Sequence, residues 1–425
     1  AITITGDKVG VGELIGVAGQ SNAGAFFTTG VETVSDLVRG YGNNFTGWQA
    51  LSGGGPSSLG NALVTAYNCP IGFIDDHADG TAIISWMGAG LPTHMNAVGG
   101  KLGGILWLQG EADWNGASNY ASYLTGLNTA LGNFRTSLGQ ATLPIVIGAL
   151  SSYTAGSGSD TTTYDQIKRA QYDHANATAN TYIVDQIDAG HVDGLHLSSA
   201  GAGLLGARVA QAFKVHLGIA TQYRGPSIAA VNKVNATTFN VIVSHRLGAD
   251  LTPATQITGF KATDPGASGA TIAVTSALRQ SATVIQLVLA SPPVGLPVIS
   301  YAAGATPVIT AMARDNSALA LPIEWAEGIT AVEKTASVSL VNASNAAQVS
   351  LTGLKWAWFD QASPDSFAAP TDKGTGEVTD GSGVLTVLIG NSGKTSGQAG
   401  WLIVTDSDGN PATVHKAFSG PVAVS

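Results

Sequence analysis

Apolar and polar positions follow two different patterns along the chain, and the change comes near residue 222. Before that point, short and nearly continuous apolar runs alternate with longer stretches that carry an apolar residue every three or four positions. Continuous runs predict strands covered on both faces, and the longer stretches predict amphipathic helices. Strands are expected over residues 14–18, 71–74, 83–86, 104–108, 144–150 and 181–184.

Two helices are predicted clearly by the spacing of their apolar residues. Residues 118–138 carry such residues at steps of three and four. Residues 57–68 place Leu59, Leu63 and Tyr67 on one face, with Ser57 or Ser58 as the expected N-cap. The alternation of strand and helix favours a three-layer α/β domain around a parallel sheet.

Beyond residue 222 the helical spacing fades and short alternating segments take its place. Turn signals such as Asp264-Pro265-Gly266 separate the segments "TTFNVIVSH", "ATIAVTS", "TVIQLVLAS" and "VISYAAG". A second group, "ASVSLVNA", "LKWAWFD", "GVLTVLIGN" and "GWLIVTD", begins near residue 330. Both groups predict antiparallel β-sandwiches. The expected domains are residues 1–222, 223–328 and 329–425, with an immunoglobulin-like third domain.

Composition narrows the class of protein further. The net charge of −9 argues against binding to nucleic acid or to an anionic membrane. A single cysteine excludes an intrachain disulfide, and no apolar run is long enough to span a membrane. The first residues do not look like a signal peptide. Few charges among many Gly, Ser, Thr and Asn residues favour an extracellular, cell-surface or virion-surface protein; the oligomeric state stays open.

The segment "GVAGQSNAGAF" places Ser21 directly after the first predicted strand. Ligands of open parallel sheets bind beyond the carboxyl ends of the strands, so Ser21 lies where a nucleophile is expected. Backbone N–H groups at the start of the following helix can stabilise an oxyanion. A plain turn is the alternative interpretation of this segment alone.

A serine nucleophile needs a base, and "DGLHLSSAG" offers one. Asp193 and His196 lie three residues apart before a helix capped by Ser198 or Ser199. This spacing lets the carboxylate hold one imidazole nitrogen and leaves the other nitrogen for Ser21. His191 is the rival base, but it lacks an acid at the same spacing.

Two further segments carry polar groups suited to the same site. In "WLQGEAD", Gln109 carries an amide donor that can face an oxyanion, and Glu111 and Asp113 are a carboxylate pair that either does acid–base chemistry or holds the loop. In "LSGGGPSSLG", the glycines offer exposed backbone N–H groups. Each segment alone is also compatible with an ordinary loop.

Together these blocks resemble the SGNH hydrolases, in the carbohydrate-esterase branch with sialate O-acetylesterases and acetyl xylan esterases. "GQSN", "GGGP", "WLQGEAD" and "DGLHLSSAG" look like that branch's blocks in the right order, and "GFIDDHADGTAIISW" looks like its Gly-Thr-x-Ile-x-x-Trp stretch. The resemblance covers about residues 10–222 and implies a flavodoxin-like fold. Two departures from the branch are Ala112 in place of serine and Ser57 in place of an acidic residue.

The resemblance implies a role for each residue of these blocks. Ser21 is the expected nucleophile, His196 the base and Asp193 the acid that orients it. The oxyanion hole is expected to combine the Ser21 N–H, the Gly55 N–H and the Gln109 side chain. Further candidates for lining the substrate pocket are Asn22, Glu111, Trp48, Trp86 and Trp114.

The expected function is removal of O-acetyl groups from acetylated oligo- or polysaccharide, with no cofactor. Asp75, Asp76, His77 and Asp79 suggest a metal site only weakly, so no metal is expected. "DSDGNP" at 406–411 lacks features of a calcium loop and predicts a hairpin turn. Two alternatives stay open: a broad short-chain acyl esterase of non-sugar substrates, and a glycan-binding or structural surface or phage-tail component with a vestigial esterase.

Overall fold

The computed structural model describes residues 12–88, 90–99, 101–114, 118–153, 161–339, 351–360, 370–378, 384–390, 392, 394, 398–405 and 418–423. The chain forms two compact units. The α/β unit comprises Ala1–Ser227, His245–Thr252 and Tyr301–Glu327, and the β unit comprises Ile228–Ser244, Pro253–Ser300 and Gly328–Ser425. The expected division into three domains stays a prediction.

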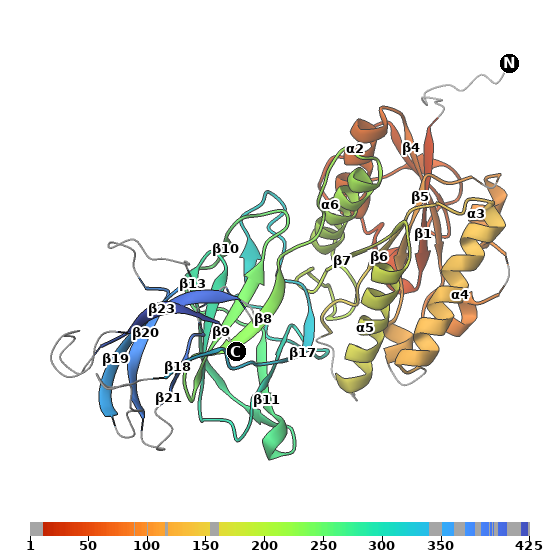
Figure 1. Cartoon of the computed structure of the whole chain (residues 1–425). Coiled ribbons are helices and arrows are strands. Elements are labelled where there is room, and N and C mark those ends of the chain that lie inside the picture. The colour runs from red at the N-terminus through yellow and green to blue at the C-terminus, as the bar shows by residue number, and fades with distance from the viewer. Residues whose placement is uncertain are drawn as a thin grey trace. The chain divides into compact units, whose positions relative to one another are not determined.

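A seven-stranded mixed sheet forms the centre of the α/β unit, in the order β3-β2-β4-β1-β5-β6-β7 (Figure 1). All neighbouring pairs are parallel except β3 with β2. The strands are β1 Glu13–Gly19, β2 Val38–Gly42, β3 Gln49–Ala50, β4 Ile71–His77, β5 Gly104–Leu108, β6 Ile145–Gly148 and β7 Thr181–Val184. The pattern predicted a parallel sheet and missed β2 and the short antiparallel β3.

Helices cover both faces of this sheet, which gives the expected three layers. Figure 1 shows α2 and α6 on one side and α3 and α4 on the other. Consecutive β1 residues divide between the layers: Ile15 and Val17 pack in the core with α2 and α6, whereas Ala18 packs with α4 and α5. The helices are α1 Ser21–Ala25, α2 Gly54–Tyr67, α3 Thr93–Ala97, α4 Tyr120–Leu138, α5 Thr161–Ala177 and α6 Ser199–His216.

Two local predictions in this unit are wrong. The segment expected as a strand over 83–86 is a short 3₁₀ helix, η1 (Ile83–Trp86), because the Ile83 N–H donates to the Asp113 side chain and only Ile83 is buried. Helix α2 begins at Gly54 with Gly53 as its N-cap, so Ser57 lies inside the helix. The Ser57 hydroxyl donates to the Gly54 carbonyl instead of capping. Ser198 does cap α6, by accepting the Gly201 N–H.

Residues 301–327 pack into the α/β unit although they follow the first β segments in sequence. The apolar run 316–325 belongs to this packing, since Leu321 and Ile323 are buried. Trp325 donates its indole N–H to Asp165 at 3.0 Å, and the Gly304 N–H donates to the same carboxylate. Burial removes water from the Asp165 carboxyl and raises its pKa. The two N–H donors act in the opposite direction, because they stabilise the ionised form that burial disfavours.

A charged cluster ties the same segment to α6. Asp188 accepts hydrogen bonds from the two terminal guanidinium nitrogens of Arg208 at 2.6 and 3.0 Å. It also accepts one from the Nε of Arg314 at 3.0 Å. The two arginines hold the pKa of Asp188 below its usual range against the opposing effect of its burial. Strands β10 (Leu251–Thr252) and β16 (Arg314–Asp315) pair in this region.

The β unit consists of short antiparallel sheets, as the alternating segments predicted. The first sheets have the orders β13-β14-β9-β8 and β12-β11-β15-β17, and the later ones β18-β21 and β20-β19-β22-β23. Trp356, Trp358 and Leu402 belong to the core of the later sheets. The segment "DSDGNP" lies outside the described residues. The strands are β8 Ser227–Lys233, β9 Thr238–Ser244, β11 Phe260–Asp264, β12 Ala270–Ile272, β13 Val274–Ser281, β14 Val284–Leu289, β15 Val298–Tyr301, β17 Ala326–Thr330, β18 Thr335–Ser339, β19 Leu351–Phe359, β20 Asp372–Val378, β21 Val384–Leu388, β22 Ala399–Thr405 and β23 Phe418–Ala423.

The role of residues 301–327 can be tested with Trp325→Ala in the full chain. The change removes the contact of the indole with the Tyr172 ring and leaves buried Asp165 with one donor fewer. We expect the free energy of unfolding to fall by about 3 kcal/mol, measured by urea denaturation. Trp48→Ala, which removes a half-exposed tryptophan, is the matched control. Equal stability of the two variants would contradict this packing.

Candidate active site

Strand β1 ends where its backbone comes close to β5. A Cβ on Gly19 would lie 1.8 Å from the Leu108 carbonyl oxygen, and Gly19 has a φ of 131°. Only glycine fits such a position. The next residue, Gln20, donates its N–H to the same carbonyl at 2.9 Å, and α1 begins at Ser21. The chain therefore turns out of the sheet and places Ser21 at the carboxyl edge of the central strand.

Ser21, His196 and Asp193 form a continuous chain of hydrogen bonds. The His196 Nε2 lies 3.0 Å from the Ser21 Oγ, and the His196 Nδ1 lies 2.6 Å from the Asp193 Oδ2. With the Nδ1 proton directed at the carboxylate, Nε2 is left to accept the serine proton. Sequence reasoning named these three residues, and the structure brings them together.

Asp193 is fixed by the loop in which it lies. Its Oδ1 accepts the backbone N–H groups of Leu195 at 2.9 Å and of His196 at 2.7 Å. The side-chain hydrogen bond with His196, followed by these backbone bonds, lowers the pKa of Asp193 well below its ordinary value. The carboxylate therefore stays ionised through the acid range in which imidazole titrates.

Asn22 connects the Ser21 segment to the His196 loop. Its amide donates to Glu111 Oε1 at 2.6 Å and to the Leu195 carbonyl at 3.3 Å, and its Oδ1 accepts the Leu197 N–H at 3.0 Å. Asn22 is almost fully buried. Its polar atoms are thus committed to holding the two loops together, which differs from the expected role of contacting substrate.

A pocket of about 590 Å³ opens beside Ser21 and His196; we call it the Ser21 pocket. Its wall includes Asp79 and Gly80 from the loop after β4, and Trp114 and Tyr153 from the loops after β5 and β6. Trp114 and Tyr153 pack edge to face with ring centroids 4.3 Å apart. Glu111 also lines the pocket. Trp114 and Glu111 are therefore placed where the sequence predicted.

The two other predicted tryptophans lie elsewhere. Trp86 lines a neighbouring cleft, and its ring meets Trp107 edge to face at 5.2 Å. Trp48 stacks on Tyr41 and is half exposed, and it lines neither hollow. The expectation that Trp48 belongs to the substrate pocket is not supported, because its ring covers Gly72 at the side of the sheet.

Gln109 does not fit the expected oxyanion role. Its amide nitrogen donates to the Thr81 carbonyl at 3.1 Å and to Asp113 at 2.5 Å, while its Oε1 accepts the Tyr123 hydroxyl at 2.9 Å. Both amide hydrogens are therefore used inside the core, and the side chain is buried. Gln109 holds the loop after β4 against α4 and the loop after β5.

Gly55 does not fit the expected oxyanion role either. Its N–H donates to the Phe26 carbonyl at 2.9 Å, and its backbone packs closely against Gly206 of α6. The strand order explains this position, since the Gly53–Gly55 segment follows β3 at the edge of the sheet. The loop after β4 is the one beside Ser21, because β4 pairs directly with β1.

Gly80 is the glycine that lines the pocket beside Ser21. It has a φ of 63° and open space where a side chain would be. Its N–H has no backbone acceptor among the described residues. The Ser21 N–H, at the first position of α1, has no partner within its helix. The signal for Gly80 was present in the sequence as the "DGT" segment.

Gln20 is a pocket residue that sequence reasoning missed. Its Oε1 accepts the N–H groups of Ala112 at 3.1 Å and Gly110 at 3.4 Å, and the residue lines the Ser21 pocket. These two bonds fix the direction of the amide, so its nitrogen is held away from Gly110 and Ala112. No simple sequence pattern marks this role beyond the position of Gln20 next to Ser21.

Three other histidines lie outside the Ser21 pocket. His191 pairs through its backbone with Leu197, and burial lowers the pKa of its imidazole. His77 and His94 are held through their Nδ1 atoms by Asp75 and Asp76, each at 2.8 Å. Within the described part of the chain, no group of three or more His, Cys, Asp or Glu side chains could hold a metal ion.

Glu111 is the carboxylate under the greatest electrostatic strain near Ser21. Its Oε1 accepts from Asn22, but its Oε2 is buried without a hydrogen-bond partner among the described residues. Desolvation raises the pKa of Glu111, against a smaller opposing effect of the Asn22 hydrogen bond. The folded protein therefore binds a proton at Glu111 more tightly than the unfolded chain does.

Comparison with known proteins is consistent with this geometry. Residues 49–215 match a family model described as a carbohydrate esterase, sialic acid-specific acetylesterase. The matching segment lies within the α/β unit. The matched range contains Gly80, Asp193 and His196 and begins after Ser21. A search of curated proteins finds no match for the chain.

One solved structure shares the fold at low sequence identity, and a second match is reported beside it. A carbohydrate acetylesterase from Xanthomonas citri is 15% identical, with a TM-score of 0.56 and coverage of 74% of this chain and 79% of that one. An acetyl-xylooligosaccharide esterase from Geobacillus is 19% identical, with a TM-score of 0.32 and coverage of 50% and 96%. Among the described residues, no helix has the length and apolar character needed to span a membrane.

The strain on Glu111 predicts a pH-dependent effect of Glu111→Gln on stability. Because the folded-state pKa is raised, the parent loses stability as pH rises above the ordinary value of 4.5, when the buried carboxyl must ionise. The variant does not titrate there, so we expect it to unfold at a higher temperature than the parent near neutral pH. The difference should shrink toward pH 4.5. A difference that is constant across this range would contradict the raised pKa.

Proposed function

We propose that this protein is a serine esterase that removes O-acetyl groups from acetylated carbohydrate through an acyl-enzyme. The observation that carries the proposal is the hydrogen-bond chain from Asp193 through His196 to Ser21 at the wall of an open pocket. A serine, an imidazole and a carboxylate in this order are the arrangement used for nucleophilic attack on acyl groups.

In the first half of the reaction, the His196 Nε2 removes the proton from the Ser21 Oγ, and the Oγ attacks the acetyl carbonyl carbon. The carbonyl oxygen becomes an oxyanion next to the N–H groups of Ser21 and Gly80. Such donors stabilise the transition state more than the ester, because the charge develops only there. The ionised Asp193 stabilises the imidazolium that forms.

In the second half, the imidazolium gives its proton to the departing sugar oxygen as the tetrahedral intermediate collapses. Water then attacks the acetyl-serine, with His196 as the base again, and releases acetate. No group outside the chain is needed for these proton transfers. The carbohydrate substrate is supported by the family of the matched segment, and by the open pocket beside Ser21.

The nucleophile is tested by Ser21→Ala. We expect kcat for 4-nitrophenyl acetate to fall by about 10⁴-fold or more, because the members of such a triad act as a unit. The fold should survive, since only one hydroxyl is lost, and an unchanged thermal midpoint checks this. Retention of most of the activity in the folded variant would rule out the proposed function.

The base is tested by comparing His196→Ala with His191→Ala, two substitutions of the same type five positions apart. We expect His196→Ala to be nearly as inactive as Ser21→Ala, since Nε2 accepts the serine proton. His191 lies outside the Ser21 pocket, so His191→Ala should change kcat only slightly. If His191→Ala were the inactive variant, the base would be wrongly assigned.

A further inference from the structure

A second hollow lies on the other side of the loop that carries Gly80. This Trp86 cleft measures about 450 Å³, and its lining includes Asn43, Ser85, Trp86 and His94. The loop divides the two hollows residue by residue: Asp79 and Gly80 line the Ser21 pocket, whereas Ala78 and Thr81 line the Trp86 cleft.

The side chains that line the Trp86 cleft are held in place before any ligand binds. The Trp86 indole N–H donates to the Thr81 hydroxyl at 2.9 Å, and its ring packs against Trp107. The His94 Nδ1 is held by Asp76 at 2.8 Å, which leaves its Nε2 for a ligand. A fixed aromatic ring beside polar groups suits the apolar face and the hydroxyls of a sugar ring, and prearrangement lowers the entropic cost of binding.

Neither hollow offers a Lys or Arg side chain from its described lining to a negatively charged sugar. No Lys or Arg is among the described lining residues of either one, whereas Asp79 and Glu111 line the Ser21 pocket. The only Lys or Arg between residues 40 and 134 is Lys101, and there is none between 170 and 207. A carboxylated sugar would therefore approach carboxylates with no compensating charge.

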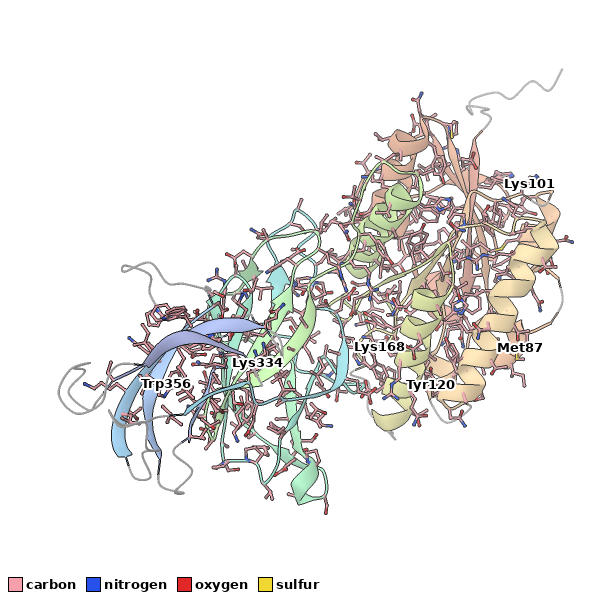
Figure 2. The ribbon with its side chains drawn as sticks, viewed as in Figure 1. Met87, Lys101, Tyr120, Lys168, Lys334 and Trp356 are labelled. Atoms are coloured by element: carbon pink, nitrogen blue, oxygen red, sulfur yellow. The ribbon has the colours of Figure 1, made fainter. Side chains whose placement is uncertain are left out.

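The nearest cations in sequence lie elsewhere in the α/β unit. Lys101 precedes β5, so it belongs to the amino edge of the sheet, opposite the carboxyl edge where Ser21 lies. Figure 2 shows Lys101 and Met87 at opposite ends of the sheet, and Met87 directly follows the 3₁₀ helix that carries Trp86. Lys168 is fully buried 3.5 Å from Asp185 and is not available to a ligand.

We infer that the Trp86 cleft is a second sugar subsite, and that the substrate is an acetylated oligosaccharide of uncharged units. The acetylated unit occupies the Ser21 pocket, and the linked unit lies against Trp86 and His94. This inference rests on the proposed function and narrows it. It separates the chain's substrate from the sialic acid named in the description of the matching family.

The subsite is tested in the full chain with Trp86→Ala and the control Trp48→Ala. For acetylated xylo-oligosaccharide, an uncharged glycan, we expect Trp86→Ala to lower kcat/KM by about tenfold or more, the size of loss found when a ring stacked on an aromatic side chain loses that partner. For 4-nitrophenyl acetate the loss should be several-fold smaller than for the oligosaccharide, since this ester needs only the Ser21 pocket. Trp48→Ala should leave the ratio of the kcat/KM values for the two substrates at the parent value.

A second variant covers the case in which Trp86→Ala disturbs the fold. Ser85→Trp fills the cleft from an exposed position, so it should lower oligosaccharide turnover while leaving 4-nitrophenyl acetate turnover in place. If either folded variant lowers kcat/KM equally for the two substrates, or lowers it for neither, the cleft is not a subsite. Activity on 4-nitrophenyl acetate that persists in Ser21→Ala would instead defeat the proposed function, so the two failures are distinct.

The preference for uncharged sugars can be measured separately. At low salt, the parent should have a kcat/KM for acetylated xylo-oligosaccharide at least about tenfold above that for O-acetylated sialic acid, because like charges repel the anionic sugar. Added salt should narrow this gap by screening the carboxylates. A preference for O-acetylated sialic acid, or a gap that does not respond to salt, would overturn the assignment to uncharged sugars.

Discussion

The close contact between Gly19 and the Leu108 carbonyl is the constraint on which the site depends. No side chain fits between these strands, and the following Gln20 N–H is bound to the same carbonyl oxygen. The chain must leave the sheet at this point, and α1 then starts at Ser21. The residues that meet Ser21 come from loops at the same edge of the sheet, since parallel strands share their carboxyl ends.

Asn22 and Gln20 turn this backbone constraint into a site with fixed geometry. Asn22 binds the His196 loop through Leu195 and Leu197, and it binds Glu111 from the loop after β5. Gln20 binds the backbone of the same β5 loop through Ala112. The residues on either side of Ser21 are thus used for positioning. The carboxyl of Glu111 is one cost of this arrangement, because its Oε2 is buried without a hydrogen-bond partner among the described residues.

The features that could be predicted from the sequence are those set by residues close together along the chain. The Asp193–His196 pair is set within one loop, and the break after β1 is set by neighbouring residues, so both could be deduced from local spacing. Gln109 and Gly55 could not be placed in this way. The direction of the Gln109 amide depends on Thr81, Asp113 and Tyr123, and the position of Gly55 depends on the strand order at the sheet edge. For the same reason, the sequence shows that residues 316–325 are apolar but not that residues 301–327 pack into the α/β unit.

The central claim is that Ser21 is the nucleophile and that His196 activates it. The most direct measurement is peptide mass spectrometry of the full chain after reaction with a serine-directed organophosphonate. The account predicts one adduct on the peptide that contains Ser21, and its loss or strong slowing in His196→Ala, because the hydroxyl needs the imidazole as its base. An adduct on another serine that accompanies complete loss of esterase activity would contradict the account.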